Sequence, residues 1–117
     1  MLEWAYEQRQ QRNTVNLETK WLEDFVALAN TRSFSASARQ RHVTQPAFSR
    51  RIRSLEQAVG ITLVDRSTTP VGLTPEGQLF VVTARNLVEQ LSECLSHLRG
   101  LETVSYTHLT LPTIYSV

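Results

Sequence analysis

The sequence contains few of the residues on which catalytic sites, metal sites and disulfide-linked folds depend. Its one cysteine, Cys94, excludes a disulfide within the chain, and its three scattered histidines show no metal-ligand spacing. With only four glycines it has no glycine-rich phosphate loop, and neither paired carboxylates nor a Ser/His/Asp set is evident. No segment resembles a signal peptide or a membrane span. These absences predict a cytoplasmic protein that is not an enzyme and that uses no metal, no cofactor and no membrane partner.

Charge is small overall but unevenly distributed along the chain. The net charge of the 117 residues is +1. Residues 32–66, however, hold seven arginines against only Glu56 and Asp65, a net charge of +5, so the remainder of the chain is acidic at −4. A basic segment within an otherwise acidic chain is typical of a surface that binds nucleic acid.

Within the basic segment, residues 45–59 have the pattern of a helix with one apolar side and one cationic side. Thr44 is expected to cap this helix, and Pro46 falls in its first turn, where a missing N–H is harmless. The apolar side is formed at helical spacing by Phe48, Ile52, Leu55 and Val59. The opposite side carries Pro46, Ser49, Arg50, Arg53 and Gln57. Such a side is either an ordinary solvated helix face or a surface that enters the major groove of DNA, where arginine and glutamine meet base edges.

The residues before this helix favour the second interpretation. Residues 34–40 are typical of a short helix capped by Ser33 or Ser35, and Ala38 is small enough to let a following helix cross closely. Residues 41–44 then provide a connection of the length that a helix-turn-helix motif needs.

Further elements are expected on both sides of this motif. Residues 18–30 predict a first core helix that is apolar over a wide arc. After Gly60, a natural helix stop, residues 61–66 and 71–73 predict two short strands around a turn-rich tip. Together the strands and the tip form a wing.

The last predicted helix is long and runs from about residue 75 to residue 99 or a little beyond. It begins with the cap signals Thr74, Pro75 and Glu76. Its first turns are expected to lie on their own small domain, and its distal half is expected to pair with a second copy of the chain. Cys94 is then a buried, small apolar side chain rather than a reactive thiol. The predicted seam has the alternating steps of four and three of a coiled coil and consists of Phe80, Ala84, Leu87, Leu91, Cys94, Leu98 and Leu101.

These elements predict a mainly α fold, namely a winged helix-turn-helix with a three-helix core and a small β-hairpin wing, followed by a long dimerising linker helix. The expected division is a poorly ordered extension at 1–16, a DNA-binding domain at 17–73, a linker helix at 74–102 and a tail at 103–117. The tail resembles the peptide that common sequencing-adapter DNA encodes. It is therefore either an assembly artefact or a genuine β-prone segment.

Several motifs, taken in their order and spacing, carry a resemblance to a known family. They are SFSASA at 33–38, VTQPAFSR at 43–50, LE at 55–56 with GITLVDR at 60–66, and LTPEG at 73–77. Residues 17–102 thereby resemble the N-terminal part of a LysR-type transcriptional regulator. Within that family, ETKWL at 18–22 and QPAFSRRIR at 45–53 resemble the hypochlorite-responsive regulators.

The resemblance implies a homodimer that binds double-stranded DNA at an interrupted palindromic operator. In this family an effector domain follows the linker helix, and this chain stops before it. No small-molecule ligand is therefore expected for this chain.

The resemblance also implies roles for individual residues. Arg53 would follow the phosphates, whereas Arg66 either contacts a phosphate or forms an ion pair with Asp65 or Glu56. Thr74 either caps the linker helix or donates to a phosphate. The positions that match the family's major-groove contacts are Gln45, Pro46, Ser49 and Arg50, with Arg50 expected to contact guanine through two hydrogen bonds. Hydrogen bonds to the DNA backbone are expected from Ser35, Ser37 and Thr44.

Two residues depart from the family pattern, and one rival function stays open. Arg41 stands where the family usually has a buried leucine, so either its stem covers the core while the guanidinium reaches solvent, or the packing there is weaker. Thr69 replaces an arginine that many relatives carry before the wing proline, so minor-groove contact by the wing is not expected. The rival function uses the linker helix alone: as a protein–protein interaction module, the chain would form mixed dimers with full-length regulators.

Overall fold

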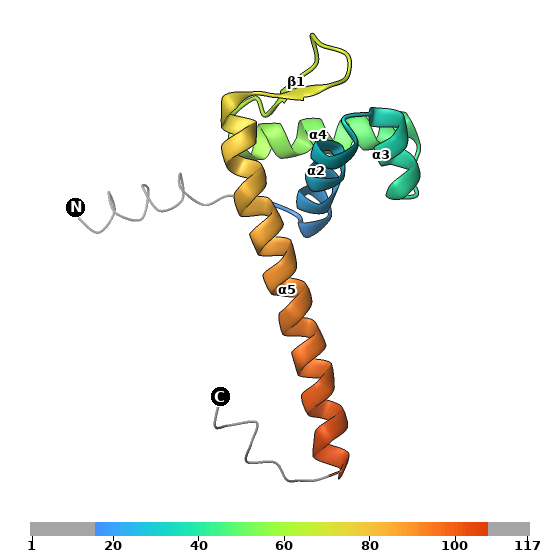
Figure 1. The fold of residues 1–117 in the computed structure, drawn as a ribbon, viewed down its shortest axis with the longest axis vertical. Coiled ribbons are helices and arrows are strands. Elements are labelled where there is room, and N and C mark those ends of the chain that lie inside the picture. Colours follow the sequence, from blue (N-terminus) through green and yellow to red (C-terminus); the bar gives the residue numbers. More distant parts are fainter. Residues whose placement is uncertain (1–15, 108–117) are drawn as a thin grey trace, which may run out of the picture. The chain divides into compact units, whose positions relative to one another are not determined.

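The computed structural model describes residues 16–107, with side chains described for residues 16–101 (Figure 1). The order of elements is α2 (Thr19–Thr31), α3 (Phe34–Gln40), α4 (Gln45–Val59), β1 (Val64–Asp65), β2 (Gly72–Leu73) and α5 (Pro75–Thr107). This order confirms the predicted mainly α, winged helix-turn-helix fold. The chain divides into a first unit that ends at Arg85 and a second that begins at Asn86, and each is described by itself. The extension predicted at 1–16 and the tail predicted at 103–117 lie mostly outside the described residues.

Helices α2, α3 and α4 contact one another and enclose the core of the first unit. Three of the four residues of the stripe predicted for α4 are inaccessible to solvent, namely Phe48, Ile52 and Leu55, and Val59 at its end is half-buried. Full burial of a side chain of this size stabilises a fold by about 1.5–3 kcal/mol, so the stripe fixes which side of α4 faces outward. The core is completed by Leu22, Phe25, Leu28, Ala38, Leu63 and Val64.

Helix ends in the motif are fixed by side-chain caps. The Ser33 hydroxyl accepts a hydrogen bond from the Ala36 amide at 3.1 Å, which makes Ser33 the cap of α3. Thr44 caps α4 as predicted and accepts from the Ala47 amide at 3.2 Å. Helix α4 ends at Gly60, whose φ of 75° is in the left-handed region that glycine adopts without strain. Of these residues, Thr44 lies between the two helices and fixes where α4 begins.

The wing is present, but its strands are shorter than predicted. Val64 pairs with Leu73 and Asp65 with Gly72, in antiparallel register. The predicted first strand, 61–66, shrinks to two residues because the segment before it is held by a side chain instead of a second strand. Glu56 on α4 accepts the Leu63 amide at 2.8 Å and the Val64 amide at 3.0 Å.

The first turns of α5 belong to the first unit, as predicted. The Phe80 ring lies 5.7 Å from the Phe25 ring, centroid to centroid, and Val81 and Ala84 are buried. Gly77 allows this approach, because a Cβ atom at that position would lie 2.0 Å from the Leu63 carbonyl oxygen. The sequence places a glycine where the backbone of α5 meets the segment leading into the wing.

In the second unit, α5 continues to Thr107. The prediction that this helix ends near residue 99, or at 102, is therefore wrong by five residues or more. That prediction was based on where the heptad seam stops. A helix can continue beyond such a seam until a residue interrupts it, and the next proline in the sequence is Pro112. No helix among the described residues is long and apolar enough to cross a membrane.

Candidate nucleic-acid interface

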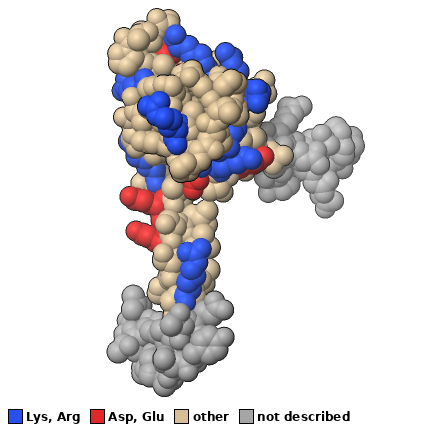
Figure 2. All heavy atoms as spheres, turned by 90° about the vertical axis from the view of Figure 1, so that its right-hand side faces the viewer, with Lys and Arg blue, Asp and Glu red and all other residues tan. Residues whose placement is uncertain are grey.

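The outward side of α4 is the main candidate surface. Opposite the buried stripe, Gln45, Pro46, Arg50 and Arg53 are exposed, and Ser49 is half-buried. Figure 2 shows basic side chains, Lys and Arg together, at several places on the surface of the first unit. The exposed side of α4 therefore combines flat, polar and cationic side chains of the kind that contact base edges and phosphates.

The structure divides the seven arginines of residues 32–66 into two groups. Arg41, Arg51 and Arg66 form ion pairs with carboxylates, the longest at 3.2 Å. In the described part of the chain, Arg50 and Arg53 have no carboxylate within ion-pair distance. The charge counted from the sequence is thus partly neutralised inside the domain. Among the described residues, four arginines of this segment are exposed and in no ion pair: Arg50 and Arg53 on the outward side of α4, Arg32 at the end of α2 and Arg39 on α3.

A second group of predicted contacts lies where α3 and α4 begin. Ser35 and Gln45 line a shallow depression together with Ser33 and with Thr69 and Pro70 of the wing tip. The exposed Ser35 hydroxyl lies 3.3 Å from that of Ser33. The Ala36 and Ala47 amides are already bonded to the capping hydroxyls of Ser33 and Thr44, so the polar groups that this depression offers to a phosphate are the side chains of Ser35 and Gln45.

Ser37 needs correction. Its side chain has no solvent exposure, and its hydroxyl lies 2.6 Å from the hydroxyl of Thr31. A phosphate cannot reach a group that is enclosed in this way, so the predicted contact between Ser37 and the DNA backbone is wrong. Ser37 instead connects the end of α2 to α3.

For Arg66 and Thr74 the structure favours the structural alternatives. Arg66 pairs with Glu56 at 3.2 Å, and its guanidinium lies 5.7 Å from the centre of the Phe34 ring. Asp65 is not the ion-pair partner of Arg66. Its carboxylate instead accepts hydrogen bonds from the side chain and the amide of Ser67, and these bonds lower the pKa of Asp65. Thr74 caps α5 by accepting from the Gly77 amide at 3.0 Å, and it donates to the Thr62 carbonyl at 2.8 Å.

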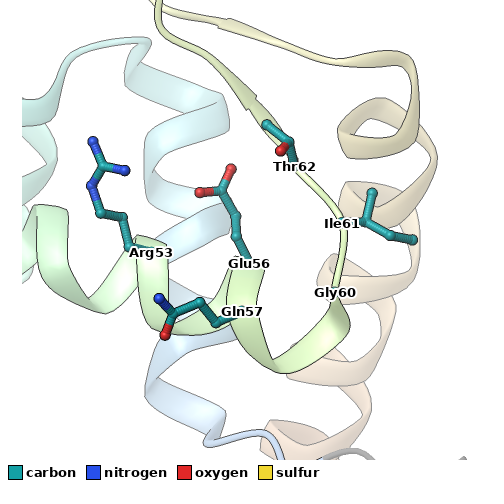
Figure 3. Close-up of a pocket in the computed structure, with 6 residues that line it drawn as sticks. All are labelled: Arg53, Glu56, Gln57, Gly60, Ile61 and Thr62. Atoms are coloured by element: carbon teal, nitrogen blue, oxygen red, sulfur yellow. The ribbon is translucent and has the colours of Figure 1, made fainter.

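A second shallow depression lies at the other end of α4 (Figure 3). Arg53 and Gln57, one helical turn apart, line it on α4, together with Glu56, whose carboxylate accepts the Leu63 and Val64 amides. Because Glu56 is already bonded to the wing, the groups free to meet a ligand here are Arg53 and Gln57. This depression extends the exposed side of α4 and is not a separate site.

A buried charged cluster was missed by the sequence analysis. Asp24 of α2 is inaccessible to solvent and accepts from Arg41 at 2.7 Å and from Arg51 at 2.6 Å. The Arg41 guanidinium bonds to Asp24 and, at 2.8 Å, to Glu23, a pairing that was not predicted, while 26% of the side chain stays exposed to solvent. Burial lowers the pKa of Arg41, but the hydrogen bonds to Asp24 and Glu23 outweigh it and raise that pKa above its ordinary value. The available signal was an aspartate within the apolar arc of the first helix.

The predicted dimer seam falls into two parts. Phe80 and Ala84 lie in the first unit, where Ala84 is buried and Phe80 half-buried. In the second unit three seam leucines are exposed, at 45% for Leu87, 42% for Leu91 and 53% for Leu98, and Leu101 is half-buried. Cys94 is also exposed in the single chain, so its predicted burial depends on a partner.

Residues 19–78 match the model of the bacterial regulatory helix-turn-helix protein, lysR family. The chain is also similar to three solved structures. DarR of Vibrio fischeri, in complex with DNA, is 55% identical with a TM-score of 0.73, over 75% of this chain and 30% of DarR. HypT of Salmonella typhimurium, a hypochlorite-specific LysR-type regulator, is 50% identical with a TM-score of 0.67, over 72% of this chain and 29% of HypT.

The third structure contains a DNA-binding domain alone. It is the domain of BenM, a regulator of Acinetobacter baylyi, in complex with the catB site 1 DNA. It is 33% identical with a TM-score of 0.73, over 75% of this chain and 99% of that domain. This chain therefore spans a DNA-binding domain of the family but less than a third of the full-length regulators.

Proposed function

This chain belongs to the LysR family of bacterial regulatory helix-turn-helix proteins, and from that premise we propose that it binds double-stranded DNA with α4 in the major groove. The observation that carries the proposal is the exposed side of α4, where Arg50 and Arg53 stand opposite the buried stripe. DarR and the BenM domain, which share the fold, are complexes with DNA. Relatives of this kind are transcriptional regulators, not enzymes.

We assign the base-reading role to the first two turns of α4. Gln45 and Ser49 lie one turn apart along one edge of the outward side, and Arg50 lies nearer the middle of that side. Arg50 also has the reach and the fork of donors for a guanine edge. Arg53, a turn further on, follows the phosphates, as do the exposed hydroxyls of Ser35 and Thr44. Arg66 and Thr74 act indirectly in this proposal, since both hold the wing to the domain.

We further propose that two copies pair through the second unit of α5. The support is its exposed row of leucines, because apolar side chains of that size at heptad spacing are stabilised when a second helix covers them. A two-fold dimer presents two α4 helices, which matches an interrupted palindromic operator with two half-sites. The same leucines also support the rival function, in which this helix pairs with a full-length regulator as a mixed dimer.

The subgroup and the location of the protein are inferred from its similarity to these relatives and from its proposed DNA target. Membership of the hypochlorite-responsive subgroup stays a prediction, because the hypochlorite-specific HypT is no more similar to this chain than DarR is. A cytoplasmic location follows from the proposed target, since bacterial DNA lies in the cytoplasm.

The test starts by enriching duplexes from a random pool with the wild-type chain and measuring affinity for the enriched and for random duplexes. Arg50→Ala is expected to weaken only the enriched duplex, by about 1–3 kcal/mol, and to relax the preference at one base pair in each half-site. Arg53→Ala is expected to weaken both duplexes alike and to flatten the salt dependence. Lys20→Ala, which removes one positive charge from α2, is the control and should change neither.

Equal losses on both duplexes for Arg50→Ala and Arg53→Ala would contradict the roles assigned to these arginines. A chain that enriches no duplex but binds full-length LysR-type regulators would instead support the mixed-dimer function.

A further inference from the structure

The Asp24 carboxylate joins all three helices of the core. Its Oδ1 accepts from Arg41 Nε at 2.7 Å and from Arg51 Nη2 at 3.0 Å, and its Oδ2 accepts from Arg51 Nε at 2.6 Å. Asp24 lies on α2, Arg41 is the C-cap of α3, and Arg51 lies on α4. Figure 1 shows these three helices side by side. A single buried group therefore connects both helices of the helix-turn-helix to the helix behind them.

The pair with Arg51 has a defined geometry as well as an attraction. Two parallel N–H to oxygen bonds hold the guanidinium and the carboxylate in one plane. A point contact would let α4 turn about its own axis, whereas a planar, two-bond contact resists that rotation. Arg51 directly follows Arg50 in the sequence, so its anchoring also determines where Arg50 points on the exposed side.

Stability alone does not account for this cluster. Taking the Asp24 carboxylate out of water and partly covering two guanidinium groups carries a desolvation penalty, and apolar residues of similar volume often stabilise a fold as well or better. The stripe of Phe48, Ile52 and Leu55 already holds α4 to the core through contacts that have no preferred direction. The charged cluster adds hydrogen bonds that have a preferred direction and can therefore fix the orientation of α4.

We propose that Asp24 is a positioning residue for sequence discrimination: through Arg51 it fixes the rotation of α4 that aims Arg50 at a base edge. The proposal rests on the function proposed above. Arginine reads guanine through two hydrogen bonds at once, and both depend on the approach angle of the guanidinium. Contacts with phosphates tolerate a small rotation, because they come from flexible cationic side chains and carry no sequence information. Loosening the Asp24 cluster should therefore reduce affinity for the preferred sequence and leave affinity for random DNA unchanged.

The experiment uses the full chain and the conservative variant Arg51→Lys. Lysine keeps the charge, so electrostatic attraction to DNA is preserved, but it cannot form the two-bond planar pair with Asp24. Affinities are measured on the duplex enriched by the wild-type chain and on random duplexes, well below the melting temperature of each variant. Arg39→Lys, an exposed arginine on α3, is the matched control.

For Arg51→Lys we expect affinity for the enriched duplex to fall roughly tenfold, within the range of one lost bidentate base contact, and affinity for random duplexes to stay within about twofold of wild type. The control Arg39→Lys should behave as wild type on both. An unchanged ratio of the two affinities, or an equal fall in both, overturns the positioning role. A wild-type chain that does not distinguish the duplexes overturns the proposed function itself, which separates the two failures.

A second variant covers the case in which Arg51→Lys does not fold. Replacing the whole cluster by apolar residues, Asp24→Leu with Arg41→Leu and Arg51→Leu, keeps the interior filled without buried charge. The folded apolar variant is expected to lose discrimination in the same way. Wild-type discrimination in this variant would show that the apolar core orients α4 by itself and would overturn the proposal.

Discussion

Replacing Gly77 by alanine tests how closely α5 approaches the segment before the wing. A Cβ atom at this position would lie 2.0 Å from the Leu63 carbonyl oxygen and 3.0 Å from its carbonyl carbon. Both are backbone atoms, so no side-chain rotation relieves the contact, and the backbone of α5 or of the wing must shift. Such a shift strains neighbouring contacts, since the Thr74 amide donates to the same Leu63 oxygen at 3.1 Å.

Two effects of opposite sign decide the size of the change. Alanine in place of glycine favours a helix by at most about 1 kcal/mol, and less in the first turn, where Gly77 lies. Overpacking a close contact typically costs about 1–3 kcal/mol, and a contact with backbone belongs at the upper end. The net expectation is a loss of about 2 kcal/mol, which lowers the melting temperature of a domain this size by roughly 8–16 °C.

Gly100 provides the matched control, because it lies in the same helix and a Cβ atom there would meet nothing within 4 Å. Gly100→Ala should stabilise the helix by about 0.5–1 kcal/mol. Thermal melts followed by circular dichroism and by tryptophan fluorescence, to which Trp21 of α2 contributes, compare the two variants with wild type. Gly77→Ala melting at or above the wild-type temperature would refute the close approach of α5 to Leu63.

Two further predictions concern assembly and capping. Leu91→Asp should prevent pairing, because a carboxylate at the seam would be buried without a partner. Sedimentation of this variant should then show monomers. The control Ser96→Asp, on the opposite side of α5, should sediment as wild type does. A wild-type chain that sediments as a monomer at tens of micromolar would contradict the proposed seam. Ser33→Ala should destabilise the domain by about 0.5–2 kcal/mol through the lost cap of α3, and Ser35→Ala should change its melting temperature little; the reverse order in thermal melts would contradict the cap.

Much of the fold could be predicted because it depends on local patterns. The apolar stripe of α4, the Thr44 cap and the stop at Gly60 are each encoded within a few residues, and the structure confirms them. The same holds for the start of α5, where Pro75 and Glu76 occupy the first turn. Periodicity and caps are properties of a single helix, so they can be recognised without knowing what the helix contacts.

The missed features depend on contacts between elements distant in the sequence. Ser37 was expected to contact the DNA backbone because of the family resemblance, but Thr31 offers it a partner inside the domain. The choice between Asp65 and Glu56 as partner of Arg66 depended on how the wing lies against α4. An aspartate such as Asp24 is usually exposed, and its burial becomes understandable only from the fold, which pairs it with Arg41 and Arg51. A sequence shows the charges but not which of them the fold pairs.

The most direct test of the central claim is to map, by nuclear magnetic resonance, which backbone amides respond when an enriched duplex is added to the chain. If α4 lies in the major groove, the largest shifts should fall on Gln45, Ser49, Arg50 and Arg53, with smaller ones at Ser35, and the amides of the buried stripe should respond less. The same titration with a random duplex should shift Arg53 more than Arg50. Shifts confined to the second unit of α5, with the exposed side of α4 unaffected, would contradict the account.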